Sequence, residues 1–250
     1  MRTNRIPLVA SPHGSRRLHL GAWLAVVLAG GCAAATTSVA PGTSALVGTV
    51  RLVPHEGVTP PSAGGSYADR ALRDAELVDY AKPGFAVVSV AGLVSPGGTA
   101  RVALRSTRFV SHFEPRYAAL GVGGSIAIRN DDSRPHVLSC PSAGVLTSVA
   151  PGAEITLPAA RVGELRCFAP GAADGGGEPI ETTLYVAPGP YAVVGPDGGF
   201  ALEGLRSPAS ERGSPAITVV VWHPRFPPLE RPVSLTPGSI ERLELELQVR

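Results

Sequence analysis

The sequence predicts an all-β protein built as a sandwich or barrel. Thirty glycines and 25 prolines interrupt the chain every few residues. Between them lie short runs in which apolar and polar residues alternate or β-branched residues dominate. Turn signals recur about every ten residues, a spacing typical of the many short strands of a β-sandwich or barrel.

The predicted strands share this alternating or β-branched pattern. In chain order they are SALVGTVRLV, FAVVSVAGL, TARVALRST, GSIAIRN, AEITLPA, TLYVAP, YAVVG, GFALEGL, AITVVVWH, RPVSLTPG and RLELELQV. Between the first two, the apolar residues of segment 66–81 fall only loosely on one helical face. This segment is therefore either a short helix or an ordered loop.

The C-terminal strands carry further signals. In YAVVGPDGGFALEGL, the tight-turn sequence Pro196-Asp197-Gly198-Gly199 joins two strands, which predicts a hairpin. AITVVVWHPRF is apolar on both faces and predicts a buried central strand. LTPGSIERLELELQV alternates apolar and charged residues and predicts a half-solvated final strand.

The N-terminus predicts export and lipid anchoring. Residues 1–31 contain four arginines and no acidic residue, and they end in GAWLAVVLAGG. This apolar stretch is shorter than the ~20 residues of a membrane span, and the pattern is that of an export signal. The residues LAGGC resemble the bacterial lipobox, whose cysteine, here Cys32, is diacylated, although Ala29 stands where leucine is usual. The alternative is an ordinary secretory signal with a chance cysteine.

The export route stays open between two pathways. Residues 15–20, SRRLHL, also resemble a twin-arginine signal, with His19 standing where a bulky apolar residue is expected. Small residues continue after Cys32, as a tether between anchor and folded protein would require.

The charge of the mature chain argues against a nucleic-acid partner. The whole chain has 22 basic and 20 acidic residues. Without the four arginines of residues 1–31, 18 basic residues remain against 20 acidic ones, a net charge of −2 over 219 residues. No basic patch remains, and this length suits one large or two small domains.

Few residues of the mature chain suit redox or metal chemistry. They are Cys32, Cys140, Cys167, His55, His112, His136 and His223. If Cys32 carries lipid, Cys140 and Cys167 remain as a pair, and two cysteines in an exported protein most often form a disulfide. His223, next to Trp222, is interpreted as a packing residue at a strand end, and His55 as a solvated loop residue.

The stretch HFEPRYAALGVGGSIAIRNDDSRPHVLSC resembles the first half of a cupredoxin domain. It is similar to the cupredoxin-like proteins often labelled methylamine-utilisation proteins. The matching residues are Phe113, Pro115, Val122, Gly123, Ile126, Ile128, Asn130, Asp132 and the ligand histidine, here His136. GELRCFAP then resembles the strand that ends in the family's cysteine ligand, here Cys167. The end of the chain resembles the carboxypeptidase-regulatory or transthyretin-like segment of the same family.

The copper ligand set that the resemblance implies is incomplete. A blue-copper site needs two imidazoles, a thiolate and a weak axial ligand. The family places its second histidine and its methionine shortly after the cysteine. Here Cys167 is followed by FAPGAAD, and Met1 is the only methionine in the chain.

Three interpretations of this end of the domain stay open. Cys140 follows His136 closely in the sequence, and the resemblance brings Cys167 to the same pole. The leading interpretation is a Cys140–Cys167 disulfide in a copper-free cupredoxin fold. The second is a non-standard metal site formed by His136, Cys167 and either Cys140 or His112, since imidazole and thiolate suit copper and zinc. The third is a set of unpaired structural residues. In each, His136 is able to cap its turn through residues 130–132.

The sequence therefore predicts a cupredoxin-like Greek-key β-sandwich and a smaller transthyretin-like β-sandwich. The expected organisation is a signal peptide at 1–31, a tether at 32–44, an N-terminal β segment at 45–107, a cupredoxin-like domain at 108–188 and a transthyretin-like segment at 189–250. The strands at 45–53 and 85–105 are expected to complete the last segment as a discontinuous domain, unless the two units share one core.

The predicted function is non-catalytic binding or scaffolding by a lipoprotein of the cell envelope, on the periplasmic or outer-membrane face. It would use no cofactor, attach to the membrane through its lipid, and bind a protein or carbohydrate partner whose identity the sequence does not give. The alternative is a periplasmic copper-binding or electron-transfer protein with an altered ligand set. No hydrolase, metalloprotease or phosphate-loop motif is present, so we expect no enzyme.

Overall fold

The computed structural model describes residues 39–54, 79–107, 110–171, 178–206 and 216–248. The regular elements in these ranges are strands, apart from the short 3-10 helix η1 (Pro141–Ala143). The all-β prediction is therefore confirmed. No helix among these residues is long and apolar enough to cross a bilayer. The export signal, Cys32, His55 and most of segment 66–81 lie outside the described residues.

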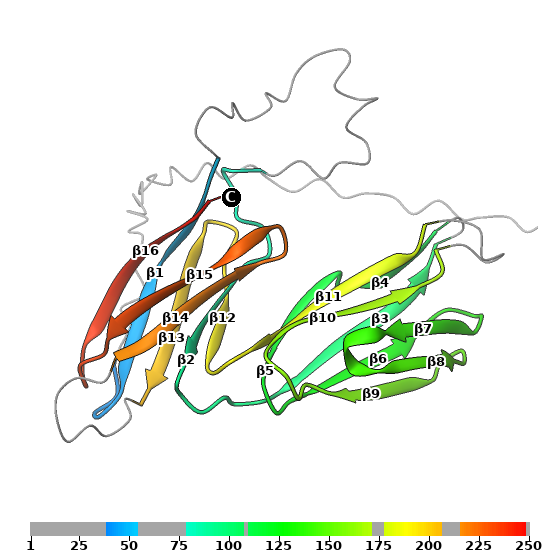
Figure 1. Ribbon diagram of the computed structural model, residues 1–250, viewed down its shortest axis with the longest axis horizontal. Coiled ribbons are helices and arrows are strands. Elements are labelled where there is room, and N and C mark those ends of the chain that lie inside the picture. The colour runs from blue at the N-terminus through cyan, green and yellow to red at the C-terminus, as the bar shows by residue number, and fades with distance from the viewer. Residues whose placement is uncertain (1–38, 55–78, 108–109, 172–177, 207–215, 249–250) are drawn as a thin grey trace, which may run out of the picture. The chain divides into compact units, whose positions relative to one another are not determined.

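Strands from both ends of the chain build a first sandwich (Figure 1). One sheet has the order β13-β1-β16, formed by Gly199–Leu205, Ser44–Val53 and Ile240–Gln248. The facing sheet has the order β12-β2-β14-β15, formed by Tyr191–Val193, Val87–Ala91, Ala216–His223 and Phe226–Ser234. The apolar residues of these strands meet in one buried cluster, which includes Leu46, Val88, Phe200, Val219 and Leu245.

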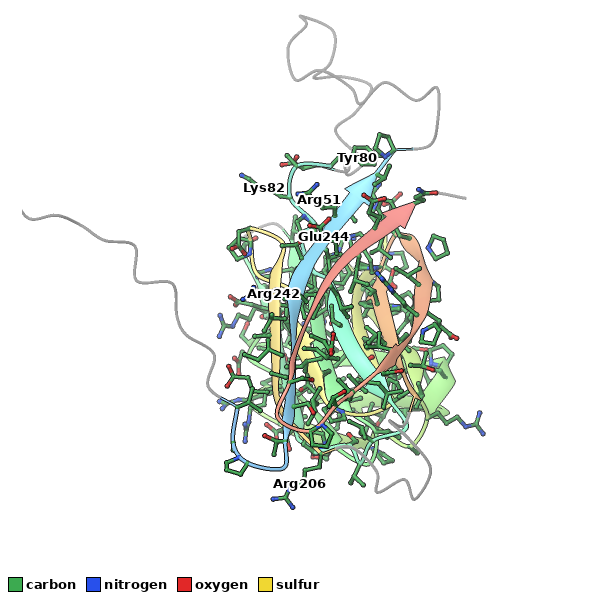
Figure 2. The ribbon with its side chains drawn as sticks, turned by 90° about the vertical axis from the view of Figure 1, so that its left-hand side faces the viewer. Arg51, Tyr80, Lys82, Arg206, Arg242 and Glu244 are labelled. Atoms are coloured by element: carbon green, nitrogen blue, oxygen red, sulfur yellow. A yellow bond between two sulfur atoms is a disulfide. The ribbon has the colours of Figure 1, made fainter. Side chains whose placement is uncertain are left out.

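The first and last strands run in parallel (Figure 2). Leu243, Leu245 and Leu247 of β16 are buried, whereas Arg242 and Glu244, labelled in Figure 2, are exposed. This alternation confirms the half-solvated final strand.

Gly48 of β1 lies opposite Leu243 of β16. A Cβ atom at Gly48 would lie 1.9 Å from the carbonyl oxygen of Leu243. Only glycine therefore fits at this point of the ladder.

The buried central strand predicted from AITVVVWHPRF is β14. It lies between β2 and β15, and Val219 and Val221 are fully buried. Its other face is also covered in part, because Thr218 and Val220 are half-buried and Trp222 is buried, which accounts for the apolar residues on both faces.

The hairpin predicted at residues 191–205 is wrong, although its turn is present. Gly195 N–H donates to the Gly199 carbonyl at 2.8 Å, and Gly199 N–H donates to Asp197 Oδ1 at 3.0 Å. The strands on either side, however, belong to different sheets, because β12 pairs with β2 while β13 pairs with β1. The turn residues determine where the chain reverses, but they do not determine which strand each neighbour pairs with. β13 pairs with β1, an arrangement that buries Phe200, Leu202 and Leu205 in the core.

The strands from β3 to β11 build a second sandwich. Their bounds are β3 Thr99–Ser106, β4 Ser111–Glu114, β5 Tyr117–Gly121, β6 Ser125–Asn130, β7 His136–Cys140, β8 Val145–Val149, β9 Glu154–Pro158, β10 Gly163–Ala169 and β11 Ile180–Ala187. One sheet has the order β4-β3-β6-β9 and the other β5-β11-β10-β7-β8. The chain passes repeatedly from one sheet to the other, and the pairs β3/β6 and β5/β11 are parallel. This is a Greek-key β-sandwich, the architecture expected from the sequence.

The second sandwich begins earlier than residue 108. β3 pairs with β4 and β6, and Val102 and Leu104 are buried in the core of this sandwich. Residues 99–106 therefore belong to it, and from the 85–105 range only β2 pairs within the first sandwich. The two parts of this range look alike in sequence, because both are short apolar strands.

A third, smaller buried cluster contains Val87, Tyr185, Ala187 and Trp222. The rings of Tyr185 and Trp222 stack with centroids 4.8 Å apart. The indole N–H of Trp222 donates to Glu164 Oε1 at 3.1 Å, so its polar atom is satisfied.

Candidate functional site

The turn between β6 and β7 is organised by Asn130, the last residue of β6. Its side chain is 1 % exposed. Its Nδ2 donates to the carbonyl oxygens of Val149 at 2.9 Å and Arg134 at 2.7 Å, and its Oδ1 accepts from the backbone N–H of Asp132 at 2.9 Å. The amide thus replaces backbone hydrogen bonds that the turn cannot make, and it sets the position of the residues that follow.

Asp132 and His136 form a buried pair at this turn. His136 Nε2 lies 2.7 Å from Asp132 Oδ2, and both side chains are 8 % exposed. The hydroxyl of Ser106 donates to the same carboxylate oxygen, and Ser106 Oγ lies 2.8 Å from Ser111 Oγ. Since Ser106 has one hydroxyl proton and donates it to Asp132, Ser111 donates to Ser106.

This network lowers the pKa of Asp132 well below its usual range. The hydrogen bond from Ser106 has the largest effect, and those from His136 and the backbone N–H of Ser133 act in the same direction, while burial opposes them. Nη2 of Arg134 lies 3.6 Å from the same oxygen and adds positive charge nearby. Asp132 is therefore ionised at neutral pH, and it fixes the orientation of the His136 ring.

The arrangement differs from that of a serine nucleophile site. In such a site the histidine lies between the serine and the carboxylate, so that it can take the hydroxyl proton. Here Asp132 lies between Ser106 and His136. The group facing the Ser106 hydroxyl is a weakly basic carboxylate, and the network orients side chains without activating a nucleophile.

Cys140 and Cys167 form a disulfide, with Cα atoms 4.3 Å apart. It joins the end of β7 to the middle of β10, and both residues are fully buried. The sulfur of Cys167 is therefore bonded to carbon and sulfur and is not a thiolate ligand.

The disulfide lies away from His136, contrary to the expectation that one pole holds all three residues. β7 and β10 are antiparallel, with Phe168 opposite Ser139. Cys167 consequently lies next to Cys140, and the four-residue length of strand back to His136 spans about 13 Å. The sequence resemblance correctly identified the two strands but not their register.

His112 is not brought to His136. It lies on β4 opposite Arg105 of β3, and it is exposed, whereas its neighbours Ser111 and Phe113 are buried. Successive side chains of a strand point to opposite faces, so His112 is on the outer face of its sheet.

The residues present do not fit a blue-copper centre. Such a centre needs two imidazoles and a thiolate within bonding distance of one ion. Here the sulfur of Cys167 is in a disulfide and His136 is hydrogen-bonded to Asp132. His112 lies on the outer face of its sheet. Within the described ranges, no group of three or more histidine, cysteine, aspartate or glutamate side chains is placed to hold a metal ion.

His223 is buried in the first sandwich and has two backbone partners. Its Nε2 donates to the Pro83 carbonyl at 3.0 Å, and its Nδ1 accepts from the Arg225 N–H at 3.0 Å. Its ring also packs edge-on against Phe226, with centroids 4.9 Å apart. It is a packing residue at the end of β14.

Ser106 is the member of the Asp132 network that sequence reasoning missed. It lies 26 residues before Asp132 and reaches it because β3 and β6 are parallel neighbours. No local pattern marks a serine for such a role. Asp132, by contrast, is one of the residues through which His136 is expected to cap its turn.

No family model and no curated protein matches this chain. Among solved structures, it is similar to a purple cupredoxin from Nitrosopumilus maritimus, with 15 % identity, a TM-score of 0.27, and coverage of 35 % of this chain and 99 % of that one. Pseudoazurin from Hyphomicrobium denitrificans gives 15 % identity and a TM-score of 0.29, covering 35 % of this chain and 74 % of that one. The copper-containing nitrite reductase of Thermus scotoductus gives 20 % identity and a TM-score of 0.27, covering 36 % of this chain and 28 % of that one. The likeness concerns the fold alone.

Proposed function

We propose that this protein is a lipid-anchored protein of the bacterial cell envelope whose cupredoxin-like sandwich serves as a copper-free binding or scaffolding module. The observation that supports the copper-free part is the position of the disulfide. It occupies the sulfur of Cys167 and lies about 13 Å along β7 from His136, the one histidine of the cupredoxin pattern that is buried in the sandwich.

The buried polar network at the β6–β7 turn has a structural role in this proposal. His136 is oriented by an ionised carboxylate, and that carboxylate is in turn held by Ser106. In a copper protein, such a histidine would be held beside a thiolate. Here it closes the turn and joins β7 to the residues of β3 and β6.

A copper titration tests the copper-free part. Residues 37–250, which form one compact unit, are titrated with Cu(I) and Cu(II) without reductant, with visible absorption and bound metal per chain as readouts. We expect neither an intense thiolate-to-copper band nor stoichiometric binding. Tight binding of one copper per chain that is lost in His136→Ala would replace this function with the alternative, a copper-binding protein with a non-standard ligand set.

Lipid labelling tests the anchor. The full chain is expressed in a bacterial host with labelled palmitate, followed by membrane fractionation. We expect label and membrane association for the wild-type chain and for Cys140→Ser, but neither for Cys32→Ser. Label that persists in Cys32→Ser would contradict the anchor while leaving the copper result untouched.

A further inference from the structure

β8 is an edge strand with an open side. It pairs with β7 and ends the five-stranded sheet (Figure 1). The Val149 carbonyl accepts a hydrogen bond from Asn130 Nδ2. Among the described residues, no strand pairs with the open side of the stretch from Val145 to Ser148. The backbone groups that point away from β7 there are able to pair with another strand.

The two strands at this edge, β7 and β8, carry no charge beyond His136 and are partly apolar. No charged residue occurs among the 17 residues from 137 to 153. On the outer face, Leu146 is 75 % and Val137 is 50 % exposed. Leu146 lies opposite Ser139, which in turn lies opposite the half-buried Phe168 of β10. Small serines thus alternate with apolar side chains on the outer face of β7 and β8.

The other sheet edges of the described residues are protected. β4, β9, β13, β15 and β16 carry charged side chains, and β15 also contains three prolines. β12 is only three residues long. β5 is uncharged, but its Ala119 carbonyl accepts from the Tyr191 hydroxyl at 3.2 Å and its Gly121 N–H donates to the Gly97 carbonyl at 2.9 Å. Charge, proline and cover are the usual means by which proteins prevent edge pairing, and β8 has none of them.

We propose that β8 is a self-association edge, on which β8 of a second copy pairs antiparallel and continues the sheet. In a two-fold antiparallel pair only the residue at the axis faces its own counterpart, and residues on either side of it face one another across the axis, so a strand with like charges near its centre would bring those charges together. The uncharged β8 avoids this repulsion, whereas β16, β15 or β9 would not. The contact closes on itself and therefore stops at a dimer.

The association is weak, because a five-residue strand and two apolar side chains make a small interface. Sedimentation equilibrium of residues 37–250 is expected to show a monomer–dimer equilibrium at about 10–500 µM. Leu146→Lys puts two lysines near the axis without disturbing a buried position. It is expected to raise the dissociation constant at least about tenfold.

Val94→Lys is the matched control. Val94 is 93 % exposed in the segment after β2, so the same substitution is made away from the edge. It is expected to leave the dimer unchanged, and both variants are expected to keep the wild-type denaturation midpoint. A wild-type chain that stays monomeric over the whole range overturns the proposal, as does equal dimerisation of Leu146→Lys and wild type.

Discussion

His223 couples the stability of the fold to pH. Its side chain is 6 % exposed, and both ring nitrogens are engaged by backbone groups in the neutral form. Burial lowers its pKa from 6.5 to about 4, and the nearby charge of Arg225 acts in the same direction, while the hydrogen bond to Pro83 opposes them. Protonation of His223 therefore favours the unfolded chain.

The size of the effect follows from these two pKa values. Between pH 6.5 and about 4 the unfolded chain binds a proton at this site that the folded protein does not. The stabilisation is fully present above pH 6.5 and is lost as the pH falls toward 4. Relative to pH 7.5, this site alone lowers the free energy of unfolding by about 2 kcal/mol at pH 5 and about 3 kcal/mol at pH 4.

Urea denaturation at pH 7.5 and pH 5 measures this difference. Trp222 is the one tryptophan of residues 37–250, so its fluorescence reports unfolding. His223→Gln keeps a donor and an acceptor but does not titrate. The variant is expected to lose about 2 kcal/mol less than the wild type between the two pH values. His112→Gln, at an exposed histidine, is expected to behave as the wild type. If His223→Gln and wild type lose the same stability, the assignment of the pH dependence to this histidine is refuted.

Three further predictions concern the two cores. The double substitution Cys140→Ala with Cys167→Ala opens a loop of sequence separation 27, and it is expected to lower the free energy of unfolding by about 3.5 kcal/mol in urea denaturation. Gly48→Ala is expected to cost more than about 3 kcal/mol or to prevent folding, measured by the same denaturation or by soluble yield, because its Cβ would overlap the Leu243 carbonyl. Asp132→Asn is expected to lower stability at pH 7 but to flatten its fall below about pH 4. The depressed pKa of Asp132 gives a stabilisation that is present above pH 3.8 and is lost as the carboxylate protonates, and denaturation at pH 2.5, 4 and 7 tests the difference.

Local patterns predicted which segments are strands but not all of their partners. The alternation of β16 indicates one buried face and the apolar run of β14 indicates a central strand, and both predictions hold. The turn after β12 was also correctly recognised, yet the strands it joins enter different sheets. Which strand each one pairs with depends on how apolar side chains are buried across the whole sandwich. The fifteen residues of this segment do not determine that pairing by themselves.

The sequence predicts the local contacts of the β6–β7 turn but not the contact with Ser106 of β3. The residue types of the β6–β7 turn indicate hydrogen bonds between Asp132 and His136, because aspartate and asparagine commonly cap such turns. Ser106 joins them only through the parallel pairing of β3 with β6. Pairing between strands that are distant in sequence decides which polar groups share a buried space.

The register of β10 against β7 shows why the resemblance alone could not decide the chemistry. With Phe168 opposite Ser139, extension of the antiparallel ladder places residue 171 level with His136, four residues beyond Cys167. A slide by four residues would bring Cys167 beside His136. Because four is an even number, every side chain of the strand would keep its face, so the inward and outward alternation alone does not separate the two registers. What distinguishes them is Cys140, which meets Cys167 in the observed register and leaves it unpaired in the other. Cys140, which the copper pattern does not require, is therefore the residue that takes up the sulfur of Cys167 in a disulfide.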